Sequence, residues 1–182
     1  MPAIVHDDFI FVHIPKCGGT SISEWIPYGT HVIGHPKLES LITPDKKKFT
    51  FTIVRNPWDR TVSAYHYLFK TKKITNFQSY IDNNTLTFEQ FVKDLKNVKV
   101  PELWFNGETQ QCEWFRSGID LIIKYENMEE DVKRLFSGSV DTPLPHEHKS
   151  EHSHYREYYT DETREIISTI FKEDIEMFHY EY

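Results

Sequence analysis

The chain has 182 residues, a length that suits one domain with a sizeable apolar core. Its 28 acidic residues exceed its 21 lysines and arginines, and the net charge of −7 argues against a protein that binds nucleic acid nonspecifically. Aromatic residues make up 15% of the chain, which argues against disorder, and no stretch approaches the ~18 consecutive apolar residues of a membrane span. We therefore predict a single domain over residues 1–182 that binds neither nucleic acid nor membrane.

The cysteines and the first residues of the chain bear on the cellular compartment. Cys17 and Cys112 are too few for a disulfide framework, and two reduced thiols are typical of a reducing compartment. The opening MPAIVHDDF has neither the basic segment nor the long apolar run of a signal peptide. These features predict a cytoplasmic protein.

Residues 9–23, with the sequence FIFVHIPKCGGTSIS, predict a buried strand, a tight turn and the start of a helix that Pro27 ends. Gly18 and Gly19 would let the backbone approach a ligand closely. The first N–H groups of the helix would face the same space and favour an anion, and Lys16 adds a positive charge. Thr20 and Ser21 could either cap the helix or donate hydroxyls to phosphate oxygens. The segment therefore predicts a phosphate or sulfate site.

A second strand and helix repeat this arrangement after an irregular stretch over residues 28–44. Residues 49–54, FTFTIV, form a strong strand pattern, and Asn56 is a suitable cap for a helix over residues 58–69. Two such units in succession predict a parallel sheet, in which neighbouring strands end at one edge. Lys16 and Arg55 would then reach one bound molecule, and Ser63 could join Arg55 on the same phosphate.

The rest of the chain predicts further elements. A capping box at Thr87–Gln90 begins a short helix, Asn127 can cap another, and a long C-terminal helix begins near Thr160 with one apolar face. The predicted ranges are a helix over 88–95, a strand over 121–125, a helix over 128–136, a loop over 137–153 and a helix over 161–178.

The motifs identify a nucleotide class by resemblance. Nucleoside triphosphatases place lysine after the last glycine of the loop, whereas Lys16 precedes both glycines, and the three spaced glycines of dinucleotide-binding proteins are absent. The order Pro-Lys-x-Gly-Gly-Thr-Ser instead resembles the 5′-phosphosulfate loop of sulfotransferases that use 3′-phosphoadenosine 5′-phosphosulfate (PAPS). Residues 51–65 resemble the 3′-phosphate motif of the same superfamily. Residues 120–136 and 155–182 are similar to its carbohydrate sulfotransferase branch.

This resemblance implies a P-loop-like three-layer α/β fold, with a central, mostly parallel sheet flanked by helices. It also implies transfer of a sulfuryl group from PAPS to a hydroxyl of a carbohydrate or small-molecule acceptor, without a metal. The implied cofactor contacts are Lys16, Cys17, Gly18, Gly19, Thr20, Ser21, Arg55 and Ser63. Cys17 stands where the family usually has threonine, so its backbone N–H would serve without a hydroxyl.

The resemblance implies catalytic roles for Lys16, which would stabilise the leaving phosphate, and for a base. His35 is the first choice for the base because imidazole suits proton transfer near neutral pH, and His31 is a rival in the same loop. We expect His13 to pack beneath the loop and His66 to be structural.

Several alternatives stay open at the level of sequence. The glycine-containing turn could bind nothing, the protein could hold PAPS or its product without turnover, or it could be a nucleotide kinase on a related fold. The four histidines at positions 146, 148, 152 and 154 could form a metal site, although their spacing fits no structural zinc pattern and favours a loop that covers the cofactor. The sequence contains no indication of the oligomeric state.

Overall fold

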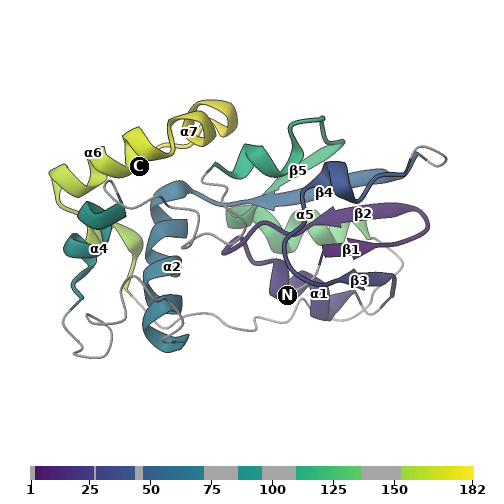
Figure 1. Cartoon of the computed structure of the whole chain (residues 1–182), viewed down its shortest axis with the longest axis horizontal. Helices are drawn as coiled ribbons and strands as arrows, with labels where there is room; N and C mark the ends of the chain where they lie inside the picture. Colours follow the sequence, from purple (N-terminus) through teal and green to yellow (C-terminus); the bar gives the residue numbers. More distant parts are fainter. Residues whose placement is uncertain (1–2, 27, 44–46, 72–85, 96–109, 137–152) are drawn as a thin grey trace. The chain divides into compact units, whose positions relative to one another are not determined.

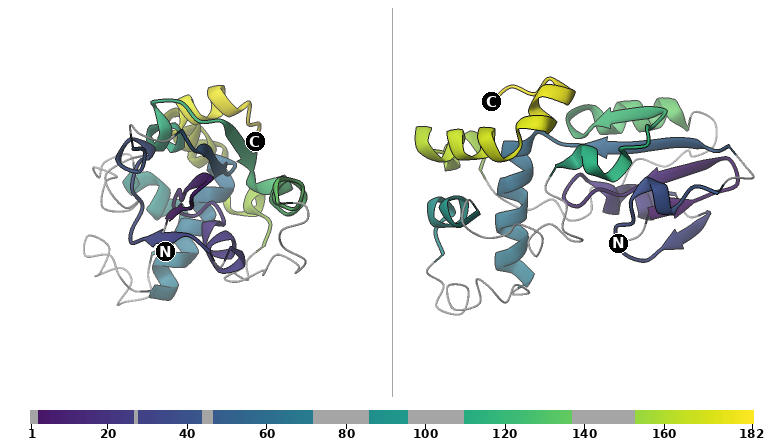
Figure 2. Two further views of the ribbon diagram at one scale, coloured as in Figure 1. Left: turned by 90° about the vertical axis from the view of Figure 1, so that its right-hand side faces the viewer. Right: turned by 45° about the horizontal axis from the view of Figure 1, so that its top comes forward.

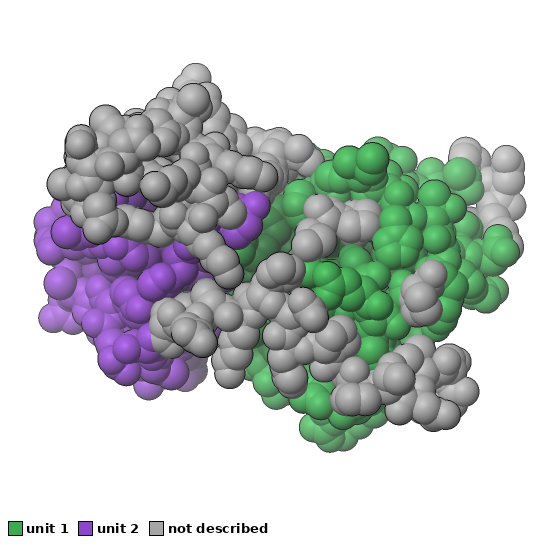
Figure 3. Space-filling view, turned by 90° about the horizontal axis from the view of Figure 1, so that it is seen from below, with its two compact units in different colours: residues 1–55, 111–149 green, residues 56–110, 150–182 purple. Residues whose placement is uncertain are grey.

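The structure is a computed structural model that describes the chain except for residues 1–2, 27, 44–46, 72–85, 96–109 and 137–152 (Figure 1). Its contacts divide the chain into two compact units. Unit 1 comprises residues 1–55 and 111–149, and unit 2 comprises residues 56–110 and 150–182 (Figure 3). The single domain over residues 1–182 stays a prediction, and each unit is described by itself.

Unit 1 is built on a five-stranded sheet in the order β3-β1-β2-β4-β5 (Figures 1 and 2). The strands β2 (Phe9–Val12), β4 (Phe49–Val54) and β5 (Leu121–Lys124) run parallel, as the sequence predicts, and β5 forms one edge of the sheet. On the other side of β2, the strand β1 (Ala3–Val5) pairs antiparallel with β2 and also with β3 (Thr30–Val32). The sheet is therefore mixed. All four residues of β2 are buried, which explains its unbroken apolar sequence.

Aromatic side chains cover one face of this sheet. The register pairs Phe9 with Phe49 and Phe11 with Phe51, so these rings project on the same side. Phe136, at the end of α5 (Met128–Leu135), packs against Phe9 and Phe51 at ring distances of 5.4 and 5.8 Å. Phe136 also contacts Trp25 of α1 (Gly19–Trp25), so the two helices share this face.

The connections within unit 1 include three short 3₁₀ helices: η1 (Leu38–Ser40), η4 (Gln111–Phe115) and η5 (Tyr125–Asn127). The stretch predicted to be irregular over residues 28–44 therefore contains β3 and η1. Asn127 stands at the start of α5, but its side chain makes no capping hydrogen bond, so that prediction is wrong. The chain enters α5 directly from η5, whereas a capping side chain needs an extended backbone.

Unit 2 is helical and contains α2 (Pro57–Thr71), α4 (Phe88–Leu95), η6 (Tyr155–Tyr158), α6 (Asp161–Ile170) and α7 (Lys172–Phe178). The caps follow the sequence: Asn56 Oδ1 accepts a hydrogen bond from the N–H of Trp58, and Thr160 forms a capping box with Thr163. Rings from separate segments pack together in its core, including Tyr65, Phe88, Phe91, Tyr158 and Tyr159.

The long C-terminal helix predicted for residues 161–178 is two helices, with a break at Phe171. Gln110 explains the break. Its Nε2 donates to the carbonyl oxygen of Ile170 at 2.5 Å, and its Oε1 accepts from the N–H of Asp174 at 3.3 Å. A side chain that inserts into the backbone ladder in this way bends or interrupts a helix. The buried Phe171 side chain anchors the break in the core.

Candidate functional site

The predicted phosphate loop lies between β2 and α1, where the backbone twice adopts a left-handed conformation. Lys16 has φ = 65° and Gly18 has φ = 77°, and Gly18 occupies the N-cap position of α1 without a side-chain capping bond. Thr20 and Ser21 consequently lie inside the first turn, so the alternative in which they cap the helix is wrong. Their possible role as hydroxyl donors to an anion stays a prediction.

The two glycines of the loop are required by packing within unit 1. A Cβ on Gly18 would lie 2.9 Å from the Tyr125 ring and 3.0 Å from the Met128 sulfur, and a Cβ on Gly19 would overlap the His13 ring. The loop therefore packs against η5, α5 and the residue that follows β2 through its glycine Cα atoms. From the sequence, both glycines are expected to allow a close approach of the ligand. In the structure, packing against neighbouring side chains is a second reason for glycine at these positions.

Lys16 and Arg55 are brought together at the carboxyl edge of the parallel strands. Arg55 directly follows β4 and donates from Nη1 to the carbonyl oxygen of Lys16 at 3.2 Å. Its guanidinium also lies 4.2 Å from the centre of the Tyr125 ring, a cation–π arrangement. The two successive strand–helix units predict this proximity of Lys16 and Arg55.

The environment of Lys16 sets its charge. Burial lowers the pKa of Lys16 to about 8, and the positive charge of Arg55 adds to this effect, while Cys17 opposes it. Burial disfavours the charged ammonium, and a neighbouring cation repels it. Lys16 is therefore mainly cationic below pH 8, and an anion bound beside both cations would favour its charged form.

Gln111, the first residue of η4, links the loop to the end of β4. It is fully buried, and its Oε1 accepts hydrogen bonds from the N–H of Arg55 at 2.8 Å and from Sγ of Cys17 at 3.0 Å. Its Nε2 donates to the carbonyl oxygen of Arg55 at 2.9 Å. Sequence reasoning missed Gln111, because its partners lie 56 and 94 residues away and no local pattern marks it.

His35 lies next to the loop through His13. The rings of His13 and His35 are 4.5 Å apart, and His13 contacts the position of Gly19. Nδ1 of His35 is 2.9 Å from the carbonyl oxygen of His13. Since a carbonyl only accepts, neutral His35 carries its proton on Nδ1, and its Nε2 holds the basic lone pair.

The other histidines occupy different environments. His31 lies within β3 opposite Ile4, and its side chain is exposed. His66 lies on α2 in unit 2 and bonds through Nε2 to the Tyr158 hydroxyl at 2.9 Å, as expected for a structural residue. Within the described ranges no group of three or more metal-ligating side chains occurs. Three of the four clustered histidines, His146, His148 and His152, lie outside those ranges.

Ser63 lies on α2 in unit 2, and it is 7% exposed. The prediction that it shares a phosphate with Arg55 rests on the sequence motif and stays a prediction. In the described part of the chain, none of the helices combines the length and apolar character needed to cross a membrane.

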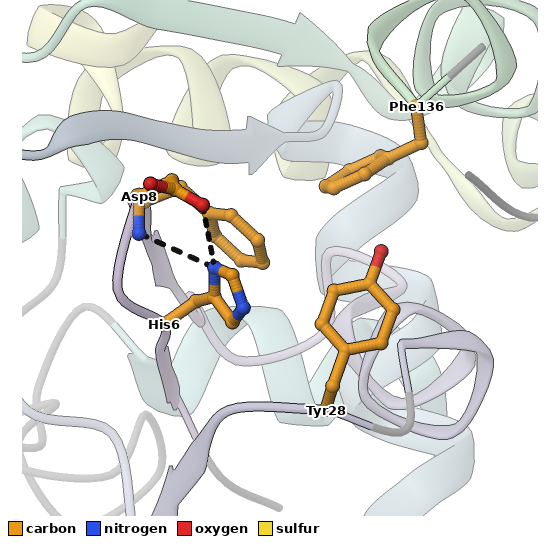
Figure 4. A pocket seen from close by; sticks show the side chains of 5 residues that line it. His6, Asp8, Tyr28 and Phe136 are labelled. Atoms are coloured by element: carbon orange, nitrogen blue, oxygen red, sulfur yellow. Dashed lines mark hydrogen bonds and ion pairs between the residues drawn. The ribbon is translucent and has the colours of Figure 1, made fainter. Parts of the chain in front are cut away.

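A separate pocket of about 440 Å³ lies at the opposite end of β2 (Figure 4). It is lined by His6, Asp8, Phe9, Tyr28 and Phe136. His6 stacks on Phe9 with ring centres 4.9 Å apart, and its Nδ1 accepts a hydrogen bond from the N–H of Asp8 at 3.2 Å. Because β2 begins at this pocket and ends at the phosphate loop, the pocket is distinct from the candidate site.

Comparisons with known proteins bear on this site. The sequence model of the sulfotransferase family matches residues 5–181, which is nearly the whole chain. An uncharacterized protein of Archaeoglobus fulgidus is 32% identical over 85 residues, a match that spans 47% of this chain and 62% of that relative's own length.

Two solved structures are similar to the chain. Mouse sulfotransferase SULT7A1 in complex with PAP superposes with a TM-score of 0.53 at 16% identity, covering 93% of this chain and 84% of the mouse chain. A sulfotransferase from Alicyclobacillus acidocaldarius has a TM-score of 0.40 at 14% identity, and the match covers 98% of each chain. The likeness to the mouse protein establishes the P-loop-like α/β fold.

Proposed function

The chain belongs to the sulfotransferase family, and from this membership we propose that it transfers a sulfuryl group from PAPS to an acceptor hydroxyl. The acceptor in this proposal is a carbohydrate or a small molecule, in line with the sequence resemblance to the carbohydrate branch. The complex of the mouse relative with PAP, adenosine 3′,5′-bisphosphate, supports the choice of nucleotide. The cytoplasmic location stays a prediction from the sequence.

The observation that carries this proposal is the pairing of Lys16 with Arg55. Two cations meet at the ends of neighbouring parallel strands, with Arg55 Nη1 only 3.2 Å from the Lys16 carbonyl oxygen. The net charge of −7 would repel a polyanionic nucleotide from the chain as a whole. A local cluster of cations and backbone N–H groups is what such a ligand needs.

In the proposed reaction an oxygen of the acceptor attacks the sulfur atom of PAPS in line with the departing phosphate. The new bond joins that oxygen to sulfur, and the bond between sulfur and the bridging oxygen of the 5′-phosphate breaks. The electron pair stays on the phosphate, where Lys16 and the N–H groups of Cys17 to Thr20 stabilise the developing charge. Arg55 and Ser63 hold the 3′-phosphate.

The acceptor proton moves to a base, which we assign to His35. In the geometry described above its Nε2 holds the lone pair, while the bond from Nδ1 to the His13 carbonyl fixes the ring. The hydroxyl proton therefore ends on Nε2 of His35. His31 is exposed on β3, and we assign it no step.

The proposal is tested with PAPS carrying labelled sulfate. Purified protein is incubated with a panel of carbohydrate and phenolic acceptors, and calorimetry with PAP measures nucleotide binding separately. We expect transfer to at least one acceptor, and we expect Lys16→Ala to lose both binding and transfer. Lys133→Ala is the matched control, because Lys133 lies exposed on α5 and pairs with Glu129.

The outcomes separate the remaining alternatives. Binding of PAP without transfer to any acceptor would favour a module that holds the nucleotide without turnover. Magnesium-dependent consumption of ATP would favour a nucleotide kinase. Absence of PAP binding by well-folded protein would overturn the proposed function.

A further inference from the structure

Gln111 offers an inference beyond the residues that the motifs identify. Its side chain is 0% exposed and makes hydrogen bonds with both backbone groups of Arg55 and with the thiol of Cys17. A buried amide that is satisfied in this way is a well-defined connection, because each broken bond would leave a buried polar group without compensation.

The place of these bonds in the fold matters. The register of the sheet pairs Val54 of β4 with Lys124 of β5, and Arg55 is the next residue. At Arg55 the amide of Gln111 takes the part of a neighbouring strand, since it accepts from the backbone N–H and donates to the backbone carbonyl. The same oxygen accepts from Cys17 Sγ, one residue after Lys16 in the phosphate loop.

We propose that Gln111 is a positioning residue of the nucleotide site. Its amide holds the backbone of Arg55 and the phosphate loop at a fixed spacing, so that the cations of Arg55 and Lys16 meet one nucleotide. This inference rests on the proposed function. Gln111 itself contacts neither phosphate; it acts through Arg55 and, by way of Cys17, through the phosphate loop.

The test uses Gln111→Met, which keeps the length and apolar stem of the side chain and removes the amide. We expect PAP affinity, measured by calorimetry on the folded protein, to fall by about 10-fold or more, as for the loss of one or two organising hydrogen bonds. Circular dichroism and thermal unfolding report whether the variant folds.

The neighbouring Gln110 provides the control. Gln110→Met is the same chemical change at an amide that also makes two backbone hydrogen bonds, but those bonds hold the break between α6 and α7 in unit 2. We expect this variant to lose stability and to bind PAP within about threefold of the wild type, the scatter expected for an uncoupled site. A similar loss of affinity in both variants would mean that Gln111 contributes only general stability.

A double-mutant cycle with Arg55→Ala separates positioning from bulk stability. If Gln111 acts through Arg55, the effect of Gln111→Met on PAP affinity shrinks when the Arg55 guanidinium is already absent. An undiminished effect would overturn the assignment. So would a Gln111→Met variant that binds PAP as tightly as the wild type.

Cys17→Ala serves if Gln111→Met does not fold, because it removes the bond between Gln111 and the loop, together with the longer thiol contact to the Pro15 carbonyl oxygen, and keeps both bonds between Gln111 and Arg55. We expect a smaller loss of affinity, of about two- to threefold, for one weak thiol hydrogen bond. Unchanged affinity in that variant would count against the connection to the loop. Failure of the wild type itself to bind PAP would overturn the proposed function, and this inference would fall with it.

Discussion

Lys16 links charge to binding at the scale of a single residue. Its pKa is lowered to about 8 by burial and by Arg55, so in the free protein the ammonium loses its proton as the pH rises through that value. Bound anions favour the charged form, so PAP affinity should be highest below pH 8. Above it, affinity should fall by up to about 10-fold per pH unit until the pKa of the complex is reached. This slope is measured by calorimetry between about pH 6.5 and about pH 9.5, a range that extends on the order of one to two units on each side of the Lys16 pKa. A flat profile would show that Lys16 does not meet the nucleotide.

His35 yields a second prediction at this scale. His35→Asn removes the proposed base but leaves the cations of the nucleotide site in place. We expect the rate of transfer to fall by about 10²–10⁴-fold, the usual contribution of a general base, with little change in PAP affinity. His31→Asn is the control and should retain the wild-type rate. The reverse pattern would identify His31 as the base.

The elements around the loop are coupled through the contact between Gly19 and His13. Gly19→Ala places a methyl group against the buried His13 ring, and we expect a loss of about 1–3 kcal/mol in the free energy of unfolding, as for other overpacked sites. Urea denaturation measures this loss. In a His13→Ala background the added methyl group has room, so the same substitution should cost less. Equal costs in the two backgrounds would contradict the described packing.

The elements with strong local patterns were predictable from sequence. The strand Phe49–Val54 and the helix Phe88–Leu95 have the predicted bounds, because each combines a clear periodicity with a turn or cap. The strands Ala3–Val5 and Thr30–Val32 have three residues each, too few for a pattern to develop, and they depend on pairing within the sheet.

Distant side chains account for the other differences. The break between α6 and α7 depends on Gln110, 60 residues from Ile170, and no glycine or proline marks it. The pairing of Lys16 with Arg55 was predictable because parallel strands share an edge, whereas the role of Gln111 was not. Amide side chains that join segments far apart in sequence leave no periodic signal.

For the whole molecule, nucleotide binding should appear as thermal protection. A ligand at 100 times its dissociation constant adds about 2.7 kcal/mol of stability if it binds only the native state. For a chain of this length that corresponds to a rise of about 5–10 °C in Tm with PAP. Adenosine 5′-monophosphate lacks the 3′-phosphate proposed for Arg55 and Ser63, so it should protect less. Equal protection by both nucleotides would argue against a 3′-phosphate site.

The two buried cysteines allow transient unfolding of unit 1 to be measured by chemical labelling. The residues Cys17 and Cys112 are 1% and 4% exposed, and both belong to unit 1. A maleimide reagent can therefore alkylate them only while that part of the chain transiently unfolds. Labelling rates, followed by mass spectrometry, would measure how often the segment that carries Lys16 opens to solvent.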